Sequence, residues 1–177
     1  LNNNNIDKLL NGIKIDIVRI NFNHIKNGKN IIEHIVNFVQ KNNLDIKKIY
    51  GSIDLPKITK SQYLLYSSML PEYKFISQDI KVDNFKNIDT ITNHKYVKQK
   101  HIAYNFYISN KFLYEISKIR SFRIAFNQKY REEPYIQGII ELNSSNDYNL
   151  IESTSKTISA ILGGCSSIIA NTNKFNS

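Results

Sequence analysis

The sequence has 177 residues, a formal net charge of +9 and a single cysteine, Cys165. That length allows one domain with a sizeable core, and one cysteine excludes an intramolecular disulfide and a cysteine-based zinc site. No apolar run reaches the roughly 18 residues of a membrane-spanning helix, so we expect a soluble, cytoplasmic protein without a membrane partner.

In chain order, the first part alternates short β-rich runs with helical apolar periodicity. The predicted elements are a short helix at residues 6–13, a strand at 17–22, a helix at 30–41, a strand at 48–53, a helix at 59–69 and a strand at 73–77. Gly51, inside a predicted strand, indicates close approach of another segment. The polar stretch from residue 79 to 99 is predicted as a loop with at most a turn of helix, which is long for a compact domain.

The second part is more regular. Residues 101–108 (HIAYNFYI) are typical of a strand, and Asn110 is a good N-cap for the long helix that follows. That helix is expected to pack through Phe112, Ile116, Ile119 and Phe126, with Glu115, Lys118 and Ser121 pointing away, and to end before Pro134. The remaining predictions are a strand at 135–142, a helix at 149–162 closed by Gly163-Gly164, and a strand at 167–170.

About six strands, most of them separated by helices, predict an α/β protein with parallel pairing. An open doubly wound sheet and a barrel both satisfy this pattern. No glycine-rich phosphate loop follows a predicted strand, so the dinucleotide-binding form of the open sheet lacks its signature. We therefore expect an incomplete (β/α)8 TIM-type barrel that occupies residues 1–177 as a single domain.

Two segments carry a family resemblance. The first is Asn110 to Arg123 (NKFLYEISKIRSFR), and the second is Asn149 to Ser167 (NLIESTSKTISAILGGCSS). Their order, separation and motifs, Glu-Ile-x-Lys-x-Arg-x-x-Arg and Leu-Gly-Gly, resemble the methylmalonyl-CoA mutase family, with weaker similarity over Ile6 to Asp54. Each motif alone also fits an ordinary helix packed on a sheet, so the joint occurrence carries the resemblance.

The resemblance implies a (β/α)8 barrel and an isomerase that interconverts methylmalonyl-CoA and succinyl-CoA. In the family's active chain an acyl-coenzyme A lies along the barrel axis, and adenosylcobalamin is carried by a separate domain. Such a cofactor performs the radical chemistry, while the protein positions the substrate and excludes solvent. No cobalamin-binding domain is recognisable in these 177 residues.

Departures from the family pattern imply that this chain does not catalyse the reaction. His101 and Ala103 stand where the family has an arginine and a serine that hold coenzyme A, and neither supplies the same contacts. Residues 81–84 (KVDN) lack the family's tyrosine and histidine, residues 142–148 (LNSSNDY) form a shortened strand-end segment, and Glu152 replaces an arginine. A full barrel has about 250 residues, so we expect this chain to lack two βα units and the terminal helix, as a fragment would.

These losses resemble the family's non-catalytic small subunit, which forms a heterodimer with the catalytic large subunit. On this interpretation the chain has no catalytic residue and no metal site, and its substrate-binding and cofactor-binding residues are unassigned. Acyl-CoA and adenosylcobalamin would bind to the partner chain.

Three alternatives stay open. The chain is a degenerate relic without activity, or a basic RNA-binding or anion-binding module, since phosphate contacts by lysine and arginine dominate such affinity. Isoleucine, asparagine and lysine supply 74 of the 177 residues, and the lysines are spread along the chain, so a biased composition explains the charge better and we expect no nucleic-acid partner. The third is an independent enzyme, with Glu115, Glu132 or Glu133 as acid–base candidates and Cys165 as a nucleophile, although solvated carboxylates and a buried thiol explain these residues more simply.

Overall fold

The computed structural model describes residues 8–22, 28–55, 57–81, 85, 88–92, 94–141 and 148–171. It divides into two compact units. Unit 1 comprises Leu1–Ser77 and His94–Ile102, and unit 2 comprises Gln78–Asn93 and Ala103–Ser177. Each unit contains a parallel sheet with helices, so the predicted α/β class with parallel pairing is confirmed.

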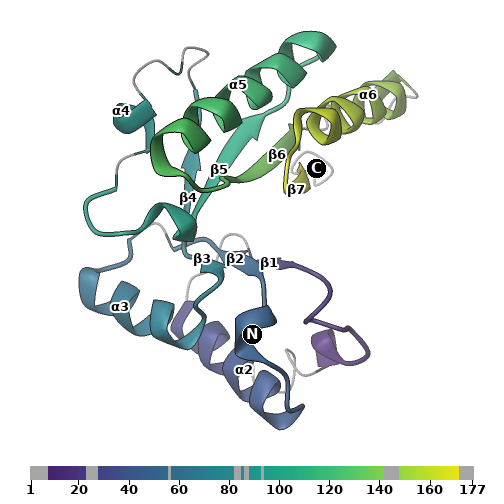
Figure 1. Ribbon diagram of the computed structural model, residues 1–177. Coiled ribbons are helices and arrows are strands. Elements are labelled where there is room, and N and C mark those ends of the chain that lie inside the picture. Colours follow the sequence, from purple (N-terminus) through teal and green to yellow (C-terminus); the bar gives the residue numbers. More distant parts are fainter. Residues whose placement is uncertain are drawn as a thin grey trace. The chain divides into compact units, whose positions relative to one another are not determined.

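Unit 1 is built on a three-stranded sheet in the order β1-β2-β3 (Figure 1). Its strands are β1 (Ile20–Phe22), β2 (Gly51–Ile53) and β3 (Tyr73–Lys74), and its main helices are α2 (Gly28–Lys41) and α3 (Lys60–Met69). β1 is shorter than predicted, because Ile17 and Val18 lie exposed before the first strand pair. β2 is also shorter, since Ile46–Lys48 forms a 3₁₀ turn capped by Asp45.

Local chemistry explains these helices and the close pairing of the strands. α2 buries Ile32, Ile35 and Val39, which recur at helical spacing, in the core of unit 1. Thr59 and Gln62 form a reciprocal capping box at the start of α3, so two N–H groups are satisfied there. Gly51 pairs with Tyr73, and a Cβ at Gly51 would come 2.8 Å from the tyrosine ring, which confirms that this strand needs a glycine.

The second sheet has the order β4-β5-β6-β7, which is also the chain order. Its strands are β4 (Ile76–Asp79), β5 (Ile102–Tyr107), β6 (Tyr135–Glu141) and β7 (Ser167–Asn171), and its helices are α4 (Ile88–Thr92), α5 (Phe112–Tyr130) and α6 (Tyr148–Gly163). The segment predicted as one strand at residues 73–77 is two strands separated by Phe75. α4 lies in the stretch predicted as a loop, whereas the 3₁₀ turn Gln99–His101 lies where that stretch meets the strand predicted at residues 101–108.

α5 departs from its predicted orientation. Its buried residues are Glu115, Ile119, Phe122 and Phe126, so the expectation that Glu115 points away from the core is wrong. The stripe through Ile119, Phe122 and Phe126 continues backward to Glu115 at helical spacing, which places this carboxylate under the helix. The N-cap is Lys111, not Asn110, and the helix ends at Arg131 in the left-handed conformation.

Aromatic rings form the core between α5 and the second sheet. Phe122 packs against Tyr104 and Phe106 of β5 with ring centroids 5.2 Å apart in both pairs, and Phe126 lies 5.4 Å from Tyr104. Because side chains alternate along a strand, these contacts identify the face of β5 that carries α5. The residues between them face the other side of the sheet.

Candidate functional site

The two segments that carry the family resemblance meet where α5 packs against the end of α6 (Figure 1). Arg120 donates from Nε to the carbonyl oxygen of Leu162 at 3.1 Å, and Arg123 donates from Nη1 to the carbonyl oxygen of Gly164 at 2.8 Å. Gly163 leaves room for Ile119, since a Cβ there would lie 2.8 Å from the Cδ1 of Ile119. The arginines thus satisfy carbonyl groups that the helix end cannot pair by itself.

A buried carboxylate lies at the first turns of α5. Glu115 is 1% exposed, and its Oε1 accepts from the backbone N–H of Ser109 at 3.2 Å and from the Ser109 hydroxyl at 2.6 Å. Its Oε2 is 2.7 Å from the Nζ of Lys118, whose side chain is nearly buried. Glu115 therefore fixes the loop that connects β5 to α5 and neutralises the lysine beside it.

A second ion pair lies within α6. The Nζ of Lys156 is 2.6 Å from Glu152, and Lys156 is 7% exposed. The hydrogen bond from Lys156 lowers the pKa of the Glu152 carboxyl, with a further contribution from a hydrogen bond of Asn110. Glu152, where the resemblance leads us to expect arginine, thus neutralises a buried lysine of its own helix.

Both ion pairs belong to the helices that follow β5 and β6. Loops at the carboxyl ends of parallel strands carry the active sites of barrel and open-sheet enzymes. Here each carboxylate has a lysine partner, and Ser109 uses the second oxygen of Glu115. The arrangement is suited to holding the α5 and α6 ends in place, and it leaves neither carboxylate as an open general base.

The side of the second sheet opposite α5 carries a row of polar residues. Asn105 pairs in register with Gln137, and Gln137 pairs with Ser167. Asp79 on β4 accepts from the Nδ2 of Asn105 at 3.1 Å. Among the described residues, the buried Oδ1 of Asn105 and Oγ of Ser167 have no hydrogen-bond partner. Buried polar atoms of this kind indicate a place for water or a polar ligand.

No sequence motif marks this polar row. Asn105, Gln137 and Ser167 lie inside predicted strands, whereas Asp79 lies in the stretch predicted as a loop. About 30 residues separate each member from the next, so only the fold brings them together. The available signal was the alternation of Tyr104 and Phe106 with Asn105 in one strand and of Ile136 with Gln137 in the next. It predicts one apolar and one polar face for the sheet, but not which residues align.

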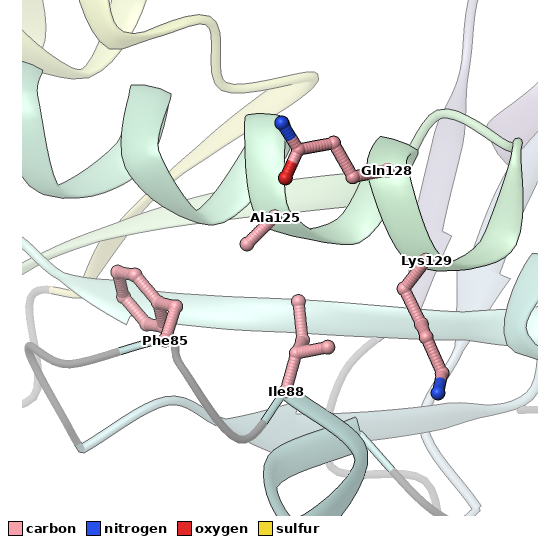
Figure 2. Close-up of a pocket in the computed structure, with 5 residues that line it drawn as sticks. All are labelled: Phe85, Ile88, Ala125, Gln128 and Lys129. Carbon is pink, nitrogen blue, oxygen red and sulfur yellow. The ribbon is translucent and has the colours of Figure 1, made fainter.

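A groove of about 480 Å³ lies between α4 and α5. Its lining residues are Phe85, Ile88, Ala125, Gln128 and Lys129 (Figure 2). Phe85 and Ile88 are buried and supply the apolar part, whereas the Nζ of Lys129 is paired with Asp89 at 2.8 Å. Because this lining holds no nucleophile and no acid–base pair, the groove is suited to apolar contact and not to catalysis.

His101 and Ala103 occupy positions where the resemblance leads us to expect coenzyme A ligands, and both are buried. The Nε2 of His101 lies 2.9 Å from the carbonyl oxygen of Pro71, and its Nδ1 lies 2.8 Å from the hydroxyl of Tyr63. That hydroxyl accepts from the backbone N–H of Lys98 at 3.2 Å, which leaves its proton for Nδ1. Burial lowers the pKa of His101, opposed by the Pro71 hydrogen bond. Neither residue is free to hold a phosphate or a thioester.

The remaining candidates lie apart from any catalytic arrangement. Cys165 is half-buried, and desolvation raises the pKa of its thiol to about 12, which disfavours the thiolate that a nucleophile requires. Glu133 pairs with Arg123, and Glu132 lies exposed after α5. Two further segments in which we expected the chain to differ from the family are residues 81–84 and 142–148. Most of both segments, residues 82–84 and 142–147, lies outside the described residues.

The same described residues lack two further features. No group of three or more histidine, cysteine, aspartate or glutamate side chains there is placed to hold a metal ion. No helix in that part of the chain is long and apolar enough to cross a membrane.

Comparison of the sequence with models of known protein families gives no match. Comparison with curated proteins likewise finds no match.

Proposed function

We propose that this chain is the non-catalytic small subunit of an adenosylcobalamin-dependent methylmalonyl-CoA mutase, folded as part of a (β/α)8 barrel. The observation that carries the proposal is the junction of α5 and α6. The two motifs were chosen by sequence alone, and they meet through Arg120, Arg123 and the Gly163-Gly164 turn. Consecutive helices on adjacent parallel strands pack together in a (β/α)8 barrel, and the contact between the two motifs supports the proposal in that sense.

The order of the strands also supports the barrel. In each sheet the strands follow one another in chain order, which is the arrangement of a singly wound barrel and not of a doubly wound sheet with a reversal point. In the second sheet, α5 packs on the side of Tyr104 and Phe106. The opposite side, with its polar row, would line the interior of the cylinder.

The proposal that this chain does not catalyse the reaction itself rests on His101 and Ala103. A buried neutral imidazole with both nitrogens used by the protein cannot serve as the arginine that the family uses for coenzyme A. Alanine has no hydroxyl to donate. The residues present therefore do not fit an acyl-CoA ligand at these two positions, and the proposal places the substrate and the adenosylcobalamin on the partner chain.

Nucleic-acid binding receives less support. Lys118 and Lys156 are nearly buried in ion pairs, and Arg120 and Arg123 donate to backbone carbonyl groups. Four cations of unit 2 thus have partners inside the protein, which reduces the charge available for phosphate.

The proposal is tested by co-expression of this chain, affinity-tagged, with a longer chain from the same genome that carries the Asp-x-His-x-x-Gly cobalamin motif. We expect the two chains to co-elute in equal amounts, and we expect the tagged chain alone to show no cobalamin absorbance. A tagged Arg123→Ala/Gly163→Ala variant, which disrupts the α5–α6 junction, should recover less partner. Binding of cobalamin by the tagged chain alone, or salt-sensitive retention on a polynucleotide without recovery of the longer chain, would contradict the proposal.

A further inference from the structure

Helix α6 exposes most of its aliphatic side chains and buries a lysine and two small residues. Lys156, Ser159 and Ala160 are buried. The exposed aliphatic residues are Leu150 (73%), Ile151 (71%), Ile158 (44%), Ile161 (58%) and Leu162 (48%). This is the reverse of the pattern of a helix that simply covers a sheet, whose outward face is polar.

The exposed residues form a continuous strip. At about 100° per residue they fall, together with Thr154, within an arc of about 120°, and they extend over roughly 18 Å of helix. The only charged residues of α6, Glu152 and Lys156, pair with each other on the opposite side. The strip, defined here as Leu150, Ile151, Thr154, Ile158, Ile161 and Leu162, carries no charge.

The one polar member of the strip is already satisfied. The hydroxyl of Thr154 donates to the carbonyl oxygen of Leu150 at 2.6 Å, and the neighbouring Ser153 hydroxyl donates to the same oxygen at 3.0 Å. Covering the strip would therefore leave no unpaired donor at its centre. The desolvation cost that usually opposes burial of a hydroxyl does not arise here.

We propose that α6 pairs antiparallel with α6 of a second copy of this chain, across a two-fold axis near Thr154 and Ile158. The strip exposes apolar surface on the order of 500 Å², as large as the largest patch on a typical monomer. Pairing two strips removes about 1,000 Å² from water, which is the lower limit for a specific interface and indicates a weak dimer. A charged partner would require complementary charges, which the strip lacks, whereas an uncharged strip is complementary to itself.

The charge of the chain provides a distinguishing property. With a net charge of +9, two copies repel each other at low ionic strength. Salt screens this repulsion and leaves apolar burial unchanged or stronger, so the dimer is expected to tighten as salt is added. An interface with an acidic protein or a polynucleotide would weaken under the same change.

Sedimentation equilibrium of the purified full chain tests the proposal. We expect a reversible monomer–dimer equilibrium that becomes tighter between low and moderate salt. Ile158→Lys should weaken dimerisation by about tenfold or more, because pairing would bury an unpartnered ammonium group. Leu64→Lys, at a comparably exposed leucine of α3, is the matched control and should dimerise as the parent does.

A second measurement guards against loss of folding in the lysine variant. In a Cys165→Ala background, Thr154→Cys should be joined into a covalent dimer by a short bismaleimide, whereas Ser61→Cys on the exposed face of α3 should not. A chain that sediments as a monomer throughout, or that is weakened equally by Ile158→Lys and Leu64→Lys, overturns the proposal. Cross-linking at both cysteines with equal yield does the same.

Discussion

The guanidinium of Arg123 donates from Nη1 to the carbonyl oxygen of Gly164 at 2.8 Å, which joins α5 to the turn that ends α6. Gly164 has a φ of +95°, a conformation that glycine adopts without cost. The same arginine pairs with Glu133 beyond the end of α5. One side chain therefore connects three segments of unit 2.

Replacing Arg123 should destabilise the protein. We expect Arg123→Ala to lower the free energy of unfolding by about 1–3 kcal/mol, since it removes a charge-assisted hydrogen bond and leaves the Gly164 carbonyl unpaired. Urea denaturation followed by far-UV circular dichroism measures the change. Arg131→Ala, at an exposed position after α5, is the control and should change stability by less than about 0.5 kcal/mol.

Gly163 should tolerate no larger side chain while Ile119 is present. An added Cβ would lie 2.8 Å from Cδ1 and 3.0 Å from Cβ of Ile119, so Gly163→Ala should cost about 1–3 kcal/mol of stability through overpacking. The double variant Gly163→Ala/Ile119→Val lacks the Cδ1 atom. Its loss of stability should be smaller than the sum of the losses in the two single variants. Strict additivity in the thermal unfolding of the four proteins would show that the two residues do not meet.

The buried pair of Glu115 and Lys118 should behave as a unit. Glu115→Gln leaves a nearly buried ammonium without its partner, and we expect a loss of about 3 kcal/mol. Lys118→Met leaves the carboxylate with only the Ser109 donors and should cost a comparable amount. The double variant should be more stable than either single variant, as measured by guanidinium unfolding; a double variant less stable than both would contradict an ionic pairing.

His101 should make stability depend on pH. Burial holds its pKa below the usual value of about 6.5, so the folded protein binds fewer protons here than the unfolded chain. The contribution of His101 to stability is therefore fully present above about pH 6.5. It is lost progressively as the pH falls from that value through the lower pKa of the folded state. Protonation of Nδ1 would also oppose the Tyr63 hydroxyl that now donates to it.

We expect His101→Gln to flatten this dependence when free energies of unfolding are compared between about pH 5 and pH 8. His34→Gln, on the partly exposed side of α2, should retain the dependence of the parent protein. An unchanged slope in His101→Gln would show that another group titrates.

Much of the fold was predictable because local chemistry specifies it. Thr59 begins α3, α2 ends at Lys41, and the Gly163-Gly164 turn ends α6, all as the sequence predicts. Errors occurred where local pattern and tertiary context compete. The spacing of apolar residues in α5 allows either Ile116 or Glu115 on the buried face. Burial of Glu115 is possible because the Ser109 hydroxyl and the Lys118 ammonium group pair with its carboxylate.

The polar row was less accessible to sequence reasoning than the helices. Asn105, Gln137 and Ser167 are remote in the chain, and their alignment depends on a register in which a one-residue slip would move each to the opposite face. The identities of His101 and Ala103 were visible in the sequence, but the burial of both side chains was not.

Periodicity and capping act over a few residues, so the order of amino acids alone predicts the alternation of strands and helices, the parallel pairing and the positions of most helix ends. Tertiary structure alone decided which distant groups meet. It placed Arg120 and Arg123 on the end of α6, supplied Glu115 with its partners, aligned the polar row, and turned the aliphatic strip of α6 toward solvent. Such contacts depend on three-dimensional register and burial, which no short stretch of sequence encodes.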